Sequence, residues 1–352
     1  MANSSSSSGQ PIIMGVPGPQ LTDGLRSLIR KVQPGGFILF ARNLESPRQV
    51  FDLIHEFNEL CQSPPIVTID QEGGRVSRLK MVGEEPPSGL MLRQANRVDW
   101  CREHGELTGR LLALFGFNLN LAPVVDYSLD ENADNSLRGR CYGSTPEEVI
   151  LKAGAFLEGM KSRGVLGTAK HFPGYTHCGL DPHGELPRID RTRAQIEKDE
   201  LRSFRAFLSL ADCYMIGHGH FPAWHPEPFP ASMSREIVSG LLVRELGYKG
   251  AIMTDDLEMG AIANRYGSKQ ATKMAIDAGE HLMLYCHNPA CVEIAWDTLC
   301  EMEPDRLQPA LDAIKRLKGK LLSAPAKFDL AAFDEVNRLT ADLRERVKKS
   351  LS

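Results

Sequence analysis

The stretch Val165-Leu-Gly-Thr-Ala-Lys-His-Phe-Pro-Gly174 begins with an apolar run and ends with a Pro-Gly pair. The apolar run Val165-Leu166 indicates the end of a buried strand, and it places Lys170 and His171 at the point where that strand should stop. Pro173 and Gly174 cannot continue regular structure, so the chain should leave the strand into a loop. The stretch therefore predicts a buried strand that carries two polar side chains at its carboxyl end.

On the loop that follows, Asp181 and His183 stand two residues apart, on either side of Pro182. Side chains at i and i+2 of an extended segment lie on one face, and Pro182 favours extended backbone at Asp181. A carboxylate in that position can orient an imidazole and stabilise its charged form, as acid–base catalysis requires. Taken alone, such a pair is more often an unrelated acid and histidine on a surface loop, so the surrounding sequence has to decide.

Short apolar runs recur along the chain and are separated by longer amphipathic stretches. The eight runs are Pro11–Gly15, Gly36–Phe40, Ile66–Ile69, a run within Phe117–Asp126, Leu166–Ala169, Cys213–Ile216, Ala251–Thr254 and His281–Cys286. Helical periodicity covers residues 48–61, 146–163, 197–210 and 269–278, and Thr145 followed by Pro146 is typical of a helix start. Buried strands that alternate with helices predict parallel βα units, and eight is the number that closes a (β/α)8 barrel.

We expect residues 11–352 to form one barrel domain with terminal helices from about residue 304, and the serine-rich residues 1–10 to be a disordered tail. The hydrophobic fraction of 42%, the charged fraction of 24% and the net charge of −4 are ordinary for a globular protein, and do not indicate binding to nucleic acid or to an anionic membrane. No apolar run approaches the roughly 18 residues of a membrane span, and the N-terminus lacks the pattern of a secretory signal. The eight cysteines contain no Cys-x-x-Cys, and several fall in apolar runs, which predicts reduced thiols in a cytoplasmic protein.

Charged or imidazole side chains follow five of the eight predicted strands. They are Asp70 to Arg75 after the third strand, Asp126 after the fourth, Lys170-His171 after the fifth, His218 after the sixth and Asp255-Asp256 after the seventh. Active sites of (β/α)8 barrels form at the carboxyl ends of the strands, where these side chains would meet. The pattern therefore predicts one shared site.

Four motifs, in this order along the chain, resemble those of family 3 glycoside hydrolases. They are Asp70-Gln-Glu-Gly-Gly-Arg-Val-x-Arg78, Lys170-His-Phe-Pro-Gly174, Asp181-x-His183 and Thr254-Asp-Asp-Leu-x-Met-Gly-Ala261. The resemblance is greatest to the single-domain β-N-acetylglucosaminidases of bacterial peptidoglycan recycling, and it runs from about Ile12 to Pro289. It implies a retaining exo-enzyme that removes terminal β-linked GlcNAc from muropeptide fragments, a small carbohydrate partner, and no cofactor.

The resemblance also implies catalytic roles for three residues. Asp255 matches the nucleophile, which the family places directly after a Ser or Thr; Asp256 competes by position, and either acid could instead cap the next helix. His183 matches a general acid/base with Asp181 as its partner, a role that an imidazole can fill because its pKa lies near working pH.

Further residues match those that hold the sugar hydroxyls and the surroundings of the N-acetyl group. They are Asp70, Arg78, Arg140, Lys170 and His171, and His218 matches a strand-end histidine of the family. Arg138 competes with Arg140 by position, and Glu72 is interpreted as structural. His218-Gly-His220 could suggest a metal pair, but the sequence offers no third and fourth ligand, so an organic site without metal is expected.

The chain departs from the family pattern in two segments. Tyr175-Thr-His-Cys178 replaces the usual His-Gly-Asp-Thr, and Ser136-Leu-Arg-Gly139 replaces Val-Ile-Gly-Asp; in addition, His281 stands where Asp is common. Two alternatives to hydrolysis stay open at this point. One is a phosphorylase, because a histidine acid/base does not repel phosphate as a carboxylate would. The other is a catalytically silent sugar-binding protein, which the retained nucleophile and acid/base positions disfavour.

Overall fold

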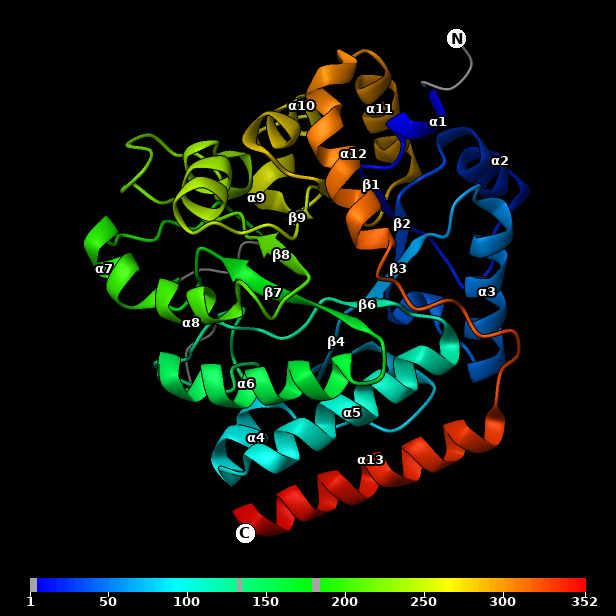
Figure 1. Cartoon of the computed structure of the whole chain (residues 1–352), viewed down its shortest axis with the longest axis vertical. Helices are drawn as coiled ribbons and strands as arrows, with labels where there is room; N and C mark the ends of the chain where they lie inside the picture. The colour runs from blue at the N-terminus through cyan, green and yellow to red at the C-terminus, as the bar shows by residue number, and fades with distance from the viewer. Residues whose placement is uncertain (1–4, 132–134, 179–183) are drawn as a thin grey trace.

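Figure 1 shows the computed structural model, which describes residues 5–131, 135–178 and 184–352. Within these residues, eight parallel strands close into a barrel in the order β1-β10-β9-β8-β7-β6-β3-β2. The strands are β1 (Ile12–Gly15), β2 (Gly36–Leu39), β3 (Ile66–Ile69), β6 (Leu119–Asn120), β7 (Leu166–Phe172), β8 (Cys213–Ile216), β9 (Ala251–Asp256) and β10 (Leu282–Tyr285). Each predicted apolar run overlaps one of them, although β7 and β9 extend past the predicted runs to Phe172 and Asp256. The predicted (β/α)8 fold is confirmed.

Alternate residues of each strand face the barrel interior and the surrounding helices. In β1, Ile13 joins the interior cluster, whereas Ile12 and Met14 pack in the outer cluster beneath the helices. Helix α12 (Pro304–Lys318) adds Ile314 and Leu317 to the interior cluster. The barrel is therefore a filled core, closed by α12 at the end where the strands begin.

Helices cover the barrel on its outside. They are α2 (Asp23–Val32), α3 (Pro47–Leu60), α4 (Gly89–Ala95), α5 (Val98–Phe115), α6 (Pro146–Lys161), α7 (Arg193–Lys198), α8 (Glu200–Phe207), a π-helix (Glu236–Glu245), α9 (Gly260–Ala263), α10 (Ser268–Ala278), α11 (Pro289–Cys300), α12 and α13 (Leu330–Leu351). Thr145 caps α6 as predicted, because its side chain accepts the Glu148 N–H while Pro146 occupies the first turn. The helix expected over 197–210 is instead divided at Asp199 into α7 and α8. Helix α13 packs along α4 and α5 (Figure 1), and no helix of the described chain combines the length and apolarity that crossing a membrane requires.

The prediction of a disordered tail over residues 1–10 is wrong for residues 5–10. Ser5–Ser8 form a short helix, α1. Gly9 packs so closely on the end of α2 that a Cβ there would lie 1.8 Å from the Val32 carbonyl oxygen. Gln10 Nε2 donates to the Gln33 carbonyl at 2.8 Å. These contacts of Gly9 and Gln10 hold residues 5–10 against the barrel, although the segment is polar.

A small hairpin extends β3 at its carboxyl end. Strands β4 (Gln71–Gly73) and β5 (Val76–Ser77) pair antiparallel around Gly73 and Gly74, whose φ angles are 113° and 55°. A Cβ on Gly73 would lie 2.2 Å from the Pro87 carbonyl oxygen, so glycine is required there by both backbone angle and space. Glu72 lies in the first strand of the hairpin and Arg78 directly follows the second, so the hairpin brings both residues beside the carboxyl ends of the barrel strands.

Candidate active site

The carboxyl ends of the strands surround a cavity of about 650 Å³, which is within the size range of small-molecule sites. Six of the predicted site residues line it: Asp70, Arg78, Arg140, Lys170, His171 and Asp255. Residues more than 180 positions apart in the sequence therefore meet in one place, as the strand-end pattern predicts.

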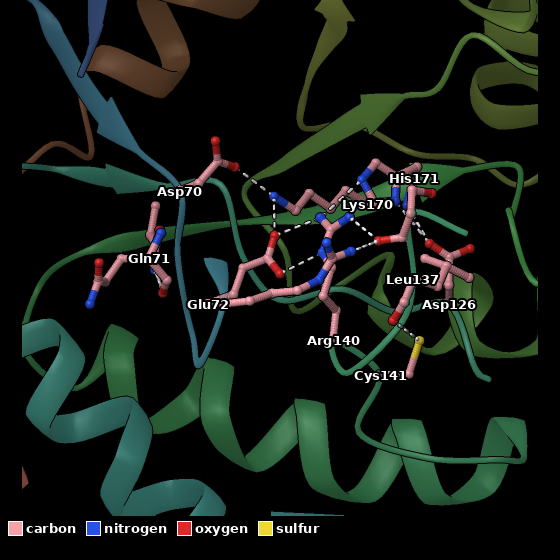
Figure 2. Close-up of polar contacts among 12 residues, drawn as sticks. Asp70, Gln71, Glu72, Asp126, Leu137, Arg140, Cys141, Lys170 and His171 are labelled. Carbon is pink, nitrogen blue, oxygen red and sulfur yellow. Dashed lines mark hydrogen bonds and ion pairs between the residues drawn. The ribbon is translucent and has the colours of Figure 1, made fainter. Parts of the chain in front are cut away.

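One wall of the cavity is built on a continuous chain of charged groups, and Figure 2 shows four of them: Asp70, Lys170, Glu72 and Arg140. Lys170 Nζ lies 2.7 Å from Asp70 Oδ1 and 2.6 Å from Glu72 Oε1. Arg140 binds Glu72 with two parallel N–H bonds of 2.8 and 2.7 Å, and Arg78 Nη2 lies 3.5 Å from Asp70 Oδ2. Bidentate contact and shared partners leave these side chains little freedom to rotate, so the wall presents its polar atoms in a fixed arrangement.

Opposite charges keep the buried acids of this wall ionised. Burial alone would raise the pKa of Glu72, but Arg140 and Lys170 together outweigh it and hold the pKa well below its ordinary value. Burial likewise opposes ionisation of Asp70, whose pKa is nevertheless lowered by Lys170 and Arg78. Burial would lower the pKa of Arg140, and Glu72 raises it instead. Asp70, Glu72 and Arg140 therefore hold fixed charges rather than exchanging protons near neutral pH.

Asp126 orients His171. Its Oδ2 lies 3.0 Å from His171 Nδ1 and also accepts the His171 backbone N–H, while its Oδ1 accepts the backbone N–H of Tyr175 at 2.7 Å. His171 Nε2 lies 3.4 Å from Arg140 Nη2, and a guanidinium can only donate, so Nε2 accepts and the proton lies on Nδ1. Tyr175 stacks on the His171 ring at 5.0 Å. These contacts fix the tautomer and the plane of the imidazole.

Asp255 and Asp256 end β9, and both line the cavity with different surroundings. Asp255 Oδ1 accepts the backbone N–H of Asp256 at 2.9 Å. Asp256 uses both carboxylate oxygens within the protein, because Oδ1 accepts the Glu258 N–H at 3.0 Å and Oδ2 lies 3.2 Å from His287 Nε2. Asp256 thus takes the turn-capping role that the sequence left open for either acid.

His218 is fully buried and, among the described residues, is not one that lines the cavity. Its Nδ1 lies 2.8 Å from Ser232 Oγ, and its Nε2 lies 2.8 Å from the Asp256 carbonyl oxygen. The carbonyl can only accept, so Nε2 carries the proton. The structure thus corrects the prediction that His218 contacts substrate: the ring supports the end of β9 from behind.

The other predicted residues divide clearly. Arg138 is exposed and stands outside the set of described residues that line the cavity, whereas Arg140 belongs to it. Asp181 and His183, the predicted acid/base pair, lie outside the described residues. In the described part of the chain, no group of three or more His, Cys, Asp or Glu side chains could hold a metal ion.

Three further residues belong to this site or to its supports. Glu72 has the structural role expected from the sequence, and it performs that role by joining Lys170 to Arg140. Asp126 received no role beyond its place at a strand end. His287, which lines the cavity just past β10, received none either. The rule that found the other residues, that polar groups follow the strands, would also have found His287.

Comparison with known proteins gives consistent results. The model of the glycosyl hydrolase family 3 N-terminal domain matches residues 10–317. A β-hexosaminidase of Tolumonas auensis is 32% identical over 282 residues, which cover 80% of this chain and 84% of that protein. A β-hexosaminidase of Pseudomonas aeruginosa is 31% identical over 313 residues, covering 88% and 91%.

Solved structures agree with this result. A family 3 β-N-acetylglucosaminidase from Paenibacillus superposes with a TM-score of 0.89 at 32% identity, covering 99% of this chain and 69% of that one. NagZ from Neisseria gonorrhoeae superposes with a TM-score of 0.82, covering 95% and 98%; at 24% identity it supports the fold alone. These comparisons give no support to a phosphorylase. This chain therefore belongs to glycosyl hydrolase family 3, as a glycosidase of the β-hexosaminidase type.

Proposed function

We propose that this protein is a retaining exo-β-N-acetylglucosaminidase that acts through a covalent glycosyl-enzyme on Asp255. The observation that carries the proposal is the position of Asp255 in the same cavity as the fixed charges of Asp70, Lys170 and Arg140. Charged side chains that cannot rotate bind sugar hydroxyls in one orientation, which places the anomeric carbon for attack. Asp255 is the better nucleophile of the two adjacent acids, because both carboxylate oxygens of Asp256 already contact Glu258 and His287.

In this mechanism, Asp255 attacks the anomeric carbon while an acid protonates the departing oxygen, and water then releases the sugar with a base removing its proton. We assign both proton transfers to His183 with Asp181 as its partner, on the strength of the Asp181-x-His183 motif. His171 is disfavoured for this role, since Asp126 and Arg140 already engage its two ring nitrogens.

We further propose that the substrate is a short glycan with terminal β-linked GlcNAc, such as a muropeptide fragment. The Paenibacillus structure with 32% identity is that of a β-N-acetylglucosaminidase, which supports the N-acetyl sugar. Burial of Cys101, Cys141, Cys213 and Cys286 in the core supports a reducing, cytoplasmic setting.

The test is a panel of 4-nitrophenyl β-glycosides of GlcNAc, glucose and xylose, with the product anomer followed by NMR during the first turnovers. The proposal expects the GlcNAc substrate to be preferred and the β-anomer to appear first. Preference for the glucoside would overturn the sugar assignment, and first release of the α-anomer would overturn the covalent route.

A further inference from the structure

Tyr175 lies just past β7, in a segment where this chain departs from the family pattern, and β7, β8 and β9 are successive neighbours in the barrel. We propose that Tyr175 is a positioning residue that joins the sugar-binding side of the cavity to its nucleophile, Asp255. Its ring fixes His171, and its hydroxyl acts through His218 on the end of β9. This inference rests on the proposed function, since it takes Asp255 as the nucleophile and His171 as a sugar contact.

The ring of Tyr175 is held against His171. Tyr175 is 1% exposed, and its ring centre lies 5.0 Å from that of His171 at an angle of 22°. Asp126, which lies beside His171 in Figure 2, holds both residues, because its two carboxylate oxygens accept their backbone N–H groups at 3.0 and 2.7 Å. Gly217 leaves the space that the ring needs, since a Cβ there would lie 2.5 Å from the Tyr175 hydroxyl oxygen. The ring is therefore confined to one position against the imidazole.

The hydroxyl of Tyr175 accepts a backbone N–H that lies past the end of the sheet. The pairing of β7 with β8 ends at Phe172 and Ile216, and the Gly217 N–H still reaches the Phe172 carbonyl at 3.0 Å. The next N–H along the chain, that of His218, is donated to Tyr175 Oη at 2.5 Å. A buried backbone N–H needs an acceptor, so the hydroxyl fixes the backbone of His218 where the ladder no longer does.

The ring of His218 supports the end of β9 in turn. Asp255 and Asp256 lie past Thr254, the last residue of β9 that pairs with β8. There His218 Nε2 donates to the Asp256 carbonyl at 2.8 Å, and the Asp256 N–H donates to Asp255 Oδ1 at 2.9 Å. Ser232 Oγ lies 2.8 Å from the other ring nitrogen of His218, so the imidazole cannot turn freely. A continuous series of hydrogen bonds therefore runs from the tyrosine hydroxyl to the carboxylate that attacks the anomeric carbon.

The surroundings of Tyr175 keep its hydroxyl protonated. Burial raises the pKa of Tyr175 well above its ordinary value, and Asp255 contributes the largest of the charge effects that raise it further. The hydroxyl thus lies close enough to Asp255 to be influenced by its charge, and it does not ionise near neutral pH. Tyr175 therefore acts by holding its neighbours in place and not by exchanging protons.

The experiment separates the hydroxyl from the ring with two variants. Tyr175→Phe removes only the acceptor of the His218 N–H, whereas Tyr175→Leu also removes the ring. With enzyme in excess over 4-nitrophenyl β-GlcNAc, single turnovers give the rate of the first step at saturation, and titration calorimetry with GlcNAc gives the affinity for the sugar.

We expect Tyr175→Phe to lower the first-step rate roughly 10- to 100-fold, because a small misplacement of a reacting group is costly in rate. Its affinity for GlcNAc should change less than about 2-fold, since the ring against His171 is kept. Tyr175→Leu should lose the same rate and should also bind GlcNAc roughly 5- to 10-fold more weakly, as expected for loss of an aromatic contact.

Tyr214→Phe is the matched control. Tyr214 on β8 is also fully buried, and its hydroxyl also contacts a backbone group, because it donates to the Phe204 carbonyl of α8 at 2.5 Å. This variant removes a comparable buried hydrogen bond on the helix side of the strand. It should leave the first-step rate and the GlcNAc affinity unchanged, even if urea unfolding shows the same loss of stability as Tyr175→Phe.

A wild-type rate in Tyr175→Phe would overturn the role of the hydroxyl, and so would equal rate losses in Tyr175→Phe and Tyr214→Phe, which would make the effect one of stability. Loss of GlcNAc affinity in Tyr175→Phe to the same extent as its rate would assign the hydroxyl to sugar binding. Unchanged affinity in Tyr175→Leu would overturn the role of the ring. No release of nitrophenolate by the wild-type enzyme would contradict the proposed function instead, and the GlcNAc affinities of the two variants would still test the ring.

Discussion

The Glu72 carboxylate lies 2.6 Å from the Lys170 ammonium, and both side chains are at most 5% exposed. Two charges taken out of water at this depth are tolerated because each has further partners: Asp70 for Lys170 and the Arg140 fork for Glu72. Loss of this pair should therefore affect both the stability of the barrel and the geometry of the cavity.

Glu72→Gln should impair both folding and catalysis. The amide keeps the shape of the carboxylate but leaves Lys170 and Arg140 without a shared anion, and breaking a buried pair in this way costs about 3–5 kcal/mol. Urea unfolding should show a loss of that order, and kcat/KM should fall with it. Glu59→Gln, at an exposed position on α3, should change neither quantity. Wild-type stability in Glu72→Gln would show that the buried charge network is not needed.

Arg140→Ala and Arg138→Ala should differ sharply. Arg140 lines the cavity and binds Glu72, so its removal should lower kcat/KM on a chromogenic GlcNAc substrate by roughly 10- to 1,000-fold. Arg138 is exposed and contributes its backbone carbonyl to Arg75, which alanine preserves. Equal losses in the two variants would mean that the segment, rather than the guanidinium of Arg140, matters.

The positions of the strands and the start of α6 could be predicted because they depend on local sequence. Apolar runs locate the barrel strands, and Thr145-Pro146 locates the start of α6. Side-chain direction could not be predicted in the same way. His218 and His287 both follow strands, yet one ring is buried behind β9 and the other lines the cavity. That difference depends on partners elsewhere in the chain. His218 contacts Ser232, 14 residues away, and His287 contacts Arg42, 245 residues away.

Composition alone misses contacts at two other places. Ser5–Ser8 read as a flexible tail, but their order comes from contacts of Gly9 and Gln10 with the end of α2. Glu72 is structural as expected, but its partner Lys170 lies 98 residues further along the chain. Contacts of this kind depend on barrel closure, so no local window of sequence contains them.

Removal of His183 should hurt substrates with poor leaving groups most. An aryl leaving group of low pKa departs with little protonation, so the first step should survive His183→Ala, while the second step still needs a base and should become slow. A burst followed by slow turnover is expected, and azide should restore the rate and yield a glycosyl azide. Asp181→Ala should show a milder form. A uniform loss across a leaving-group series, without azide rescue, would assign the acid/base role elsewhere.

Acid should destabilise the protein through His104, which is 1% exposed in α5 beside Phe156. Burial lowers its pKa from the ordinary 6.5 to about 3, so the folded state disfavours its protonation. The contribution of neutral His104 to the free energy of unfolding is therefore fully present above pH 6.5, and it is lost as the pH falls towards 3. Between pH 6.5 and 5, the free energy of unfolding should fall by about 2 kcal/mol from this residue.

His104→Phe removes this titration and should flatten the acid side of the stability profile by that amount in urea unfolding. His55→Ala, at an exposed position, should keep the wild-type slope. Parallel profiles for the wild-type protein and His104→Phe would exclude His104 as the source of acid sensitivity.

The most direct test of the account is to trap the glycosyl-enzyme and identify the labelled residue. A 5-fluoro GlcNAc glycoside with a good leaving group should slow the second step and leave the sugar attached, and peptide mass spectrometry then locates it. We predict the label on Asp255 in the wild-type protein and no label in Asp255→Ala, whose turnover should be lower by several orders of magnitude. A label on Asp256, or full turnover with no trapped sugar, would contradict the assignment of Asp255 as the nucleophile.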